Sequence, residues 1–192
     1  MSRLPYVVSA LALAACLVIP LVTPAYAGSG GFSLSSAEIK PGQSLVSAHV
    51  FNGFGCEGGN QSPALSWTAG PEGTRSYAVT MYDPDAPTGS GWWHWVVYNI
   101  PANVTHLETN AGEVSGKNLP AGAVHGRTDF GAAAFGGACP PVGDKPHRYI
   151  FTVYALKADV LEIPADASAA LIGYMIHSAK LGKATLTAKY AR

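Results

Sequence analysis

The chain is poor in charge. Charged residues make up only 12% of its 192 positions, and twelve basic residues balance twelve acidic ones for a formal net charge of zero. The sequence therefore has no basic surplus to neutralise a nucleic-acid backbone, and we expect no nucleic-acid partner. It also has no acidic block of the kind that forms disordered tails, and a hydrophobic content of 48% argues against intrinsic disorder.

Glycine and proline are abundant instead, with 22 and 14 copies. Frequent turn residues in a chain with little charge indicate many short strands rather than a helix bundle. A length near 200 suits one domain with a hydrophobic core, and the chain contains no internal repeat and no linker. The sequence predicts a single, mainly β domain.

The long apolar run at the N-terminus has the form of an export signal. Arg3 supplies a positive start, residues 7–22 carry no charge, and Ala25-Tyr26-Ala27 fits the small-x-small rule for cleavage. We expect residues 1–27 to be removed, which leaves a domain of residues 28–192. The alternative is a membrane span of about 20 apolar residues, but prolines interrupt this stretch.

A second alternative for the N-terminus is lipoprotein processing. The segment Leu13-Ala14-Ala15-Cys16 has the form of a lipobox, although the strongly apolar residues 17–19 that follow Cys16 make this the weaker reading. No other hydrophobic segment is long enough to cross a bilayer. The mature protein is thus expected to be exported, either to the periplasm or to the medium.

Cysteine is scarce, with three copies in the whole chain. Cys16 would leave with the signal, so Cys56 and Cys139 remain as an even pair. Such a pair in an oxidising compartment predicts a disulfide, which would close a loop of about 80 residues and add roughly 4 kcal/mol of stability in the chain-entropy model. The alternative is two free, buried thiols. Neither cysteine has a CxxC neighbour, so we expect no metal role for them.

Short runs bounded by Gly, Pro, Asn or Asp predict the strands. They cover residues 32–36, 45–49, 64–67, 77–82, 92–100 and 148–156. Residues 92–100 and 149–155 are β-branched and aromatic, as in central strands covered on both faces. A final strand over residues 184–190 is expected at a sheet edge, and the Gly- and Ala-rich residues 112–137 are expected to form a long loop near the functional surface.

A single segment, residues 168–181, has a helical period. Asp166 or Ser168 can cap it, and Gly182 follows its last turn. The apolar positions expected to face the core are Ala170, Leu171, Tyr174, Met175 and Ala179.

Polar residues that could bind a ligand or take part in catalysis cluster in two segments of the sequence. In the first, a strong strand runs into Asp83-Pro84-Asp85-Ala86-Pro87, and the next strand brings His94 among tryptophans, on a face with Trp92, Val96 and Tyr98. In the second, Pro140-Pro141 precedes His147-Arg148-Tyr149, which offers an imidazole, a guanidinium and a phenol to an anion. Together these residues predict a small polar pocket at strand ends.

Each of these features also has an ordinary structural explanation. Asp-Pro-Asp is often only a turn, His94 alone would be a satisfied core histidine, and Arg148 would be a surface charge paired with Asp144. Asp129-Phe130-Gly131 spells a kinase motif by coincidence, because the other kinase motifs are missing. Residue types alone leave metal binding, acid–base chemistry and phosphoryl binding open for the pocket.

The order and spacing of these motifs resemble the phosphatidylethanolamine-binding protein (PEBP) family, in particular its bacterial Raf kinase inhibitor-like branch. The resembling segments are residues 55–63 (GCEGGNQSP), 83–87 (DPDAP), 89–95 (GSGWWHW), 140–141 (PP) and 143–149 (GDKPHRY). The similarity covers about residues 32–190. The resemblance implies a β-sandwich with Greek-key antiparallel sheets and peripheral helices, including one near the C-terminus.

The resemblance also implies a ligand pocket for phosphate, acetate or a phosphorylethanolamine head group. The residues it assigns to that pocket are Asp83, Asp85, Pro87, Trp92, His94, Pro140, Pro141, His147 and Tyr149. Within this set His94 is implied to donate to the anion, whereas the family arginine at Arg148 is taken as structural. Ala138 departs from the branch, which often has proline before the cysteine, and this is expected to loosen the rim.

Three functions follow as hypotheses. The first is a non-enzymatic, exported binding protein for a small phosphorylated or carboxylated ligand, without a cofactor or a bound metal. The second is a hydrolase or metal-dependent enzyme that uses Asp83, Asp85, His94 and His147. The third is an inhibitor of a protease or other envelope protein, with binding energy from exposed loops such as residues 112–137. The resemblance also allows a homodimer.

Overall fold

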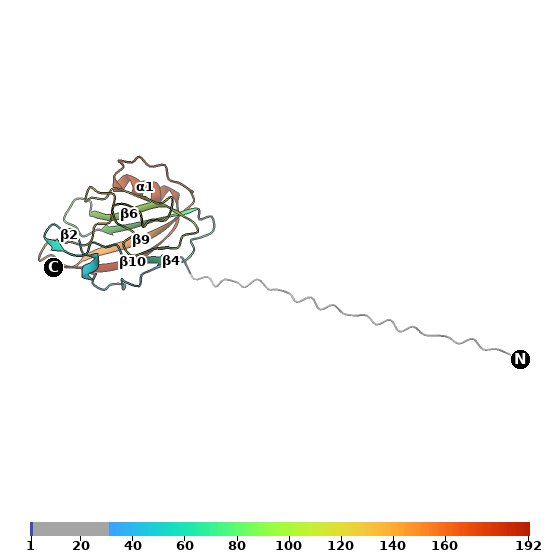
Figure 1. Cartoon of the computed structure of the whole chain (residues 1–192), viewed down its shortest axis with the longest axis horizontal. Helices are drawn as coiled ribbons and strands as arrows, with labels where there is room; N and C mark the ends of the chain where they lie inside the picture. Colours follow the sequence, from blue (N-terminus) through green and yellow to red (C-terminus); the bar gives the residue numbers. More distant parts are fainter. Residues whose placement is uncertain (2–30) are drawn as a thin grey trace.

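The computed structural model describes Met1 and residues 31–192 of the chain (Figure 1). The expected export signal over residues 1–27, apart from Met1, and the lipobox Cys16 lie outside the described residues. Among the residues that are described, no helix combines the length and the apolar composition that a membrane crossing requires.

A five-stranded antiparallel sheet forms the body of the protein, which confirms the mainly β fold. Its strand order is β10-β9-β5-β6-β8. These strands are β5 (Ser76–Asp83), β6 (Trp92–Pro101), β8 (Val124–His125), β9 (His147–Leu156) and β10 (Lys180–Tyr190). The first strand of this order, β10, is the predicted C-terminal edge strand. The two strands predicted to be central, β6 and β9, both lie inside the sheet, on either side of β5.

Two smaller sheets accompany the large one. β1 (Leu34–Ser35), β4 (Leu65–Trp67) and β7 (His106–Leu107) form a three-stranded sheet, and β2 (Asn52–Gly53) pairs with β3 (Cys56–Glu57). The strand expected over residues 45–49 is wrong, because Ser47–His49 form the 3₁₀ turn η1. The amide of His49 donates to the carbonyl of Val46 at 3.0 Å and closes this turn.

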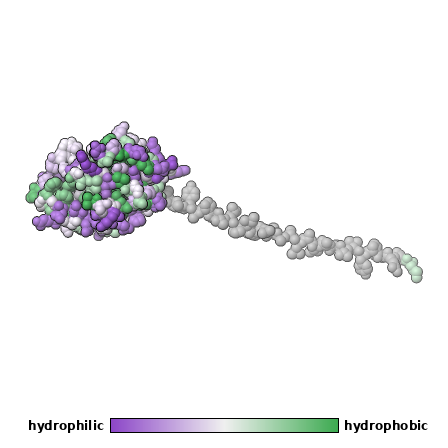
Figure 2. All heavy atoms as spheres, turned by 45° about the horizontal axis from the view of Figure 1, so that its top comes forward, coloured by the Kyte–Doolittle hydropathy of each residue, from purple (hydrophilic) through white to green (hydrophobic). Residues whose placement is uncertain are grey.

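Hydrophobic residues cover both faces of the large sheet. On one face Val79, Trp95 and Phe151 pack with residues of β4 and β7 to form the sandwich core. On the other face Val96 and Tyr98 pack against the single α-helix that the described residues contain, α1 (Ala169–Ala179). The outer surface mixes hydrophilic and hydrophobic residues on the side shown in Figure 2, in keeping with the low charge content.

Helix α1 lies within the predicted range but presents a different face. Ser168 caps it by accepting a hydrogen bond from the Leu171 amide at 3.2 Å. Its buried residues are Ala169, Ile172, Ile176 and Ala179. Of the predicted core residues, Ala179 is confirmed, whereas Leu171 and Tyr174 are exposed.

The reason for the different face is the space that Ile172 occupies. Its Cδ1 lies 2.5 Å from the position that a Cβ on Gly126 would take. Because Gly126 has no side chain, Ile172 can pack directly against the backbone there. Gly182 does not cap the helix, because Lys180 is already extended and begins β10.

A disulfide joins Cys56 on β3 to Cys139, as the sequence predicted. The two cysteines are 83 positions apart and connect the β2–β3 hairpin to the segment that precedes β9. A crosslink over so long a loop restricts the unfolded chain strongly.

Reduction of this disulfide should lower the free energy of unfolding by about 2–5 kcal/mol. Urea unfolding with and without dithiothreitol measures the difference. A Cys56→Ala, Cys139→Ala variant provides the control, because its stability should match that of the reduced protein and should not respond to dithiothreitol. Equal stability of the oxidised and reduced wild-type protein would contradict the prediction.

Candidate functional site

A cavity of ≈200 Å³ lies at one end of the large sheet. β5 ends there, and its neighbours β6 and β9 begin there because both run antiparallel to it. The lining residues are Phe54, Asp83, Ala86, Pro87, Thr88, Trp92, His94, Phe130, Cys139, Pro140, Pro141, His147 and Tyr149. Eight of the nine residues expected in a pocket therefore line one cavity, and Asp85 does not.

Asp83 is the last residue of β5 and is 2% exposed. One carboxylate oxygen accepts hydrogen bonds from the amides of Asp85 (2.8 Å) and Ala86 (3.1 Å), which closes the turn after the strand. The other oxygen accepts from His147 Nδ1 at 2.8 Å. Since protein donors already occupy both oxygens, Asp83 acts as the anchor of the site.

His147 opens β9 and is 1% exposed. Asp83 holds its Nδ1, and Asp144 Oδ2 lies 3.4 Å from its Nε2. Both ring nitrogens thus face carboxylates. This double contact fixes the plane of the ring at the wall of the cavity.

His94 lies at a β-bulge. In the pairing of β5 with β6, Met81 lies opposite Trp95 and Tyr82 opposite Trp93, so His94 is the extra residue. A bulge breaks the alternation of side chains along a strand. The predicted shared face with Val96 and Tyr98 is therefore wrong, because those two residues face α1 whereas the His94 ring contacts Tyr149, with ring centroids 5.2 Å apart.

Two backbone carbonyls orient the His94 ring. Its Nδ1 donates to the oxygens of Gly136 at 2.8 Å and Gly137 at 3.1 Å. Glycine is needed at position 137, because a Cβ there would lie 2.5 Å from the His49 oxygen. Burial, which outweighs these hydrogen bonds and nearby carboxylates, lowers the pKa of His94 to about 4. Nε2 has no protein partner among the described residues.

Tyr149 contributes the other polar group without a partner. Its side chain is fully buried and lines the cavity, and its hydroxyl forms no hydrogen bond within the described part of the chain. Burial, assisted by the negative charge of Asp83 and opposed only in part by the nearby backbone amide of Cys139, raises the pKa of this phenol. It therefore remains a neutral O–H donor in the cavity.

Aromatic rings form one wall of the cavity. The Phe130 ring lies 5.4 Å from that of Trp92, 5.3 Å from that of His94 and 5.9 Å from that of Phe54, measured between centroids. The sequence analysis missed Phe130 and Phe54, along with Ala86 and Thr88. Phe130 lies in the segment of residues 112–137, which reaches the cavity as expected and is interrupted only by the short strand β8. The sequence placed this segment near the site but did not indicate which of its side chains enters the cavity. This loop is tied to β6, since Asp129 Oδ2 accepts from the Trp93 amide at 2.7 Å.

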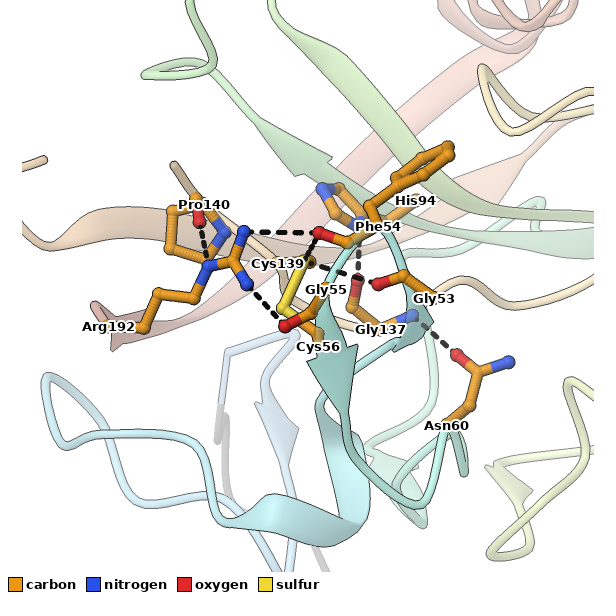
Figure 3. The surroundings of a disulfide bond; sticks show 10 residues. All are labelled: Gly53, Phe54, Gly55, Cys56, Asn60, His94, Gly137, Cys139, Pro140 and Arg192. Carbon is orange, nitrogen blue, oxygen red and sulfur yellow. Dashed lines mark hydrogen bonds between the residues drawn. A yellow bond between two sulfur atoms is a disulfide. The ribbon is translucent and has the colours of Figure 1, made fainter. Parts of the chain in front are cut away.

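The rim is held at the disulfide by a residue that the sequence analysis also missed. Figure 3 shows the Arg192 guanidinium between the two segments that the disulfide joins. It donates to the carbonyls of Pro140 (2.6 Å), Gly55 (2.7 Å) and Phe54 (3.2 Å). The end of the chain thus bridges the two sides of the rim.

Ala138 strengthens the rim instead of loosening it. Its amide donates to the His49 carbonyl at 3.1 Å, and its own carbonyl accepts from the Phe51 amide at 3.0 Å. Proline has no N–H and could not form the first of these bonds. The expected loosening at position 138 is therefore wrong.

Asp85 points away from the cavity and binds Arg148. The guanidinium donates from Nε to Oδ2 and from Nη2 to Oδ1, both at 2.9 Å, and the Arg148 amide donates to Oδ2 as well. These hydrogen bonds lower the pKa of Asp85 to about 2. Arg148 is structural, as the resemblance implied, but its partner is Asp85 and the simple pairing with Asp144 is wrong.

The four residues of the metal or hydrolase hypothesis do not form a ligand set. Asp85 binds Arg148, and Asp83 is occupied by His147 and by two backbone amides. Within residues 31–192 no group of three His, Cys, Asp or Glu side chains could hold a metal ion. The geometry instead offers an apolar cavity with two unpartnered polar groups.

Asp85→Asn should destabilise the protein by about 1 kcal/mol at neutral pH, because Arg148 is half-exposed and solvent screens the pair. The folded-state pKa lies below the unfolded value of 3.8, so this contribution is complete above pH ~4 and is lost as the pH falls toward 2. Urea unfolding measures the free energy of unfolding of the variant and the wild type, and the difference between them should be smaller at pH 2.5 than at pH 6. Asp159→Asn, which breaks the fully surface pair with Arg75, is the control and should change stability by under ~0.5 kcal/mol. A difference for Asp85→Asn that persists unchanged at pH 2.5 would contradict this account.

Comparison with known proteins agrees with this architecture. The family model for phosphatidylethanolamine-binding protein matches residues 35–191. YbcL of Escherichia coli is 58% identical over 164 residues, 85% of this chain and 90% of YbcL, and YbhB of the same organism is 47% identical over 159 residues, 82% of this chain and 99% of YbhB.

A solved structure gives the same result. The crystal structure of E. coli YbcL, described as a new member of the mammalian PEBP family, superposes with a TM-score of 0.82 and covers 84% of this chain and 98% of that one. The residues matched by the family model, 35–191, include the three strands that border the cavity, β5, β6 and β9, and the helix on the other face of the sheet. The chain therefore belongs to the phosphatidylethanolamine-binding protein family.

Proposed function

We propose that this protein is an exported, non-enzymatic binding protein whose cavity takes a small phosphoryl or carboxylate group, such as the head group of a phosphorylethanolamine-like ligand. The observation that carries the proposal is the Tyr149 hydroxyl, a buried donor without a protein partner that lines the cavity. A buried donor without a hydrogen bond costs about 1–3 kcal/mol of stability. A hydroxyl that lines a cavity without a protein partner therefore points to a ligand that supplies the acceptor.

The shape of the cavity supports a small ligand. A volume of ≈200 Å³ accommodates a phosphoryl group with a short substituent and is below the range of drug-sized sites. His94, His147 and Tyr149 lie at its inner end on strands of the sheet, while Phe54, Trp92 and Phe130 form an apolar wall. The polar groups would hold the anion, and the wall would cover an attached small organic group.

A binding role also fits the way in which the two carboxylates are used. A carboxylate that acts as a general base or nucleophile needs a free lone pair beside the ligand, and both oxygens of Asp83 already accept from protein donors. Asp85 is bound to Arg148. The carboxylates thus shape the cavity, and the proposal assigns them no chemical step.

Export rests on two independent features. The N-terminal 27 residues have the composition of an export signal, and a disulfide closes the rim of the cavity. Disulfides persist in oxidising compartments and are rare in the cytosol. Inhibition of an envelope protein, the other function expected from the sequence, stays a prediction.

Tyr149→Phe separates binding from folding. The hydroxyl has no partner, so the variant should be as stable as the wild type or slightly more stable. Its affinity for phosphorylethanolamine should fall roughly ten- to hundredfold, because a hydrogen bond to a charged group contributes about 1.5–3 kcal/mol. Titration followed by tryptophan fluorescence measures the affinity, since Trp92 lines the cavity.

Tyr77→Phe is the matched control. Tyr77 is equally buried near the opposite end of β5, and its hydroxyl accepts from the Gly70 amide at 2.8 Å. This variant should lose about 1–3 kcal/mol of stability and keep its affinity. Unchanged affinity in Tyr149→Phe would contradict the proposed function.

A further inference from the structure

We infer that the cavity binds its anion together with a proton, held between His94 Nε2 and an oxygen of the ligand. The inference rests on the proposed function and specifies the chemistry of the same site. It makes His94 the residue that selects which ionic form of the ligand is bound.

The hydrogen bonds of His94 determine its tautomer. A carbonyl oxygen can only accept, so Nδ1, which faces the oxygens of Gly136 and Gly137, must carry a hydrogen. A neutral imidazole has one N–H, and Nε2 is then a bare acceptor. Burial keeps the free ring neutral at ordinary pH, since the pKa of His94 is about 4. Before binding, His94 therefore offers the ligand a lone pair and no donor.

The groups around His94 do not change this assignment. From β5, Asp83 faces it with a negative charge, and Asp129 on the loop before Phe130 adds a weaker one. From β9 come the neutral Tyr149 ring, in edge contact with His94, and His147, which is bound to Asp83. The segment of residues 136 and 137 contributes only carbonyl oxygens. No lysine or arginine lines the cavity.

A fully ionised anion meets a conflict in this cavity. Its oxygens can accept from the Tyr149 hydroxyl, but an oxygen opposite His94 Nε2 would place two lone pairs against each other in an apolar site. One proton removes the conflict. It either comes from solvent to Nε2, forming an imidazolium that donates to the anion, or enters on the ligand and is donated to Nε2. Both routes add one proton to the complex.

This stoichiometry has a measurable consequence. Binding that takes up one proton strengthens by about tenfold for each unit by which the pH falls, as long as the pH stays above the pKa of the free group. For an anion that stays fully ionised, the affinity should thus rise roughly hundredfold between pH 7 and pH 5. A cavity that binds without a proton would show no such slope.

Sulfate is the sharpest probe, because it carries no titrating proton in this range and any proton must come to the protein. Calorimetric titration of the disulfide-bonded protein with sulfate at pH 7, 6 and 5 should give the tenfold steps. His106→Gln, at an exposed histidine paired with Glu108, is the control and should keep the same slope. His94→Gln should bind more weakly and with an affinity that is independent of pH.

Nuclear magnetic resonance of the wild-type protein identifies the group that takes up the proton and does not depend on a variant that folds. With ¹⁵N-labelled histidine, the free protein should show His94 as the neutral Nδ1–H tautomer at pH 6. Saturating sulfate should convert this signal to an imidazolium. A neutral His94 in the saturated complex, or equal sulfate affinity at pH 5 and pH 7, would overturn the inference and leave anion binding intact. Failure of both sulfate and phosphate to bind at any of these pH values would overturn the proposed function itself and the inference with it.

Discussion

The bulge at His94 is the constraint on which the rest of the site depends. Regular pairing of β6 with β5 would leave His94 and Trp95 on opposite faces, and one of them would face α1. The extra residue turns His94 toward Tyr149 and frees its carbonyl to accept from the Gly136 amide at 2.9 Å. The glycine segment can then approach closely enough for its carbonyls to hold Nδ1, which links the sheet, the long loop and the disulfide rim at one ring.

The polar groups of the cavity divide into two sets. One set is saturated by the protein: Asp83 with His147 and the turn after β5, and Asp85 with Arg148. The other set consists of His94 Nε2 and the Tyr149 hydroxyl, for which the described residues provide no partner. The first set holds the second in place, and such a cavity needs little rearrangement when a ligand binds. The crosslink at Cys139 and the Arg192 bridge add to this rigidity at the mouth.

The sequence predicted the long strands and the helix from turn residues and apolar runs, and the disulfide from an even pair of cysteines behind an export signal. The eight residues of the cavity were implied by the resemblance to the family, because composition and spacing alone left the chemistry of the pocket open. The errors of the sequence analysis have nonlocal causes. Residues 45–49 have strand composition, yet a hydrogen bond closes η1. The buried face of α1 depends on the gap above Gly126, and the direction of His94 depends on a bulge. Phe130 and Arg192 lie at the site because the tertiary fold brings their segments there. Asp85 lies outside the cavity because it binds Arg148, which is 63 positions away in the sequence.

The central claim is that a small anion binds at His94 and Tyr149. The most direct test is a titration of the ¹⁵N-labelled protein with phosphorylethanolamine, followed through the amide signals of the whole domain. The account predicts saturable changes confined to the ends of β5, β6 and β9 and to the segments around Phe130 and Cys139. A separate cavity lies between the sheet and α1, where Trp93 and Gly173 are among its lining residues. Absence of any saturable change, or changes centred on that separate cavity, would contradict the account.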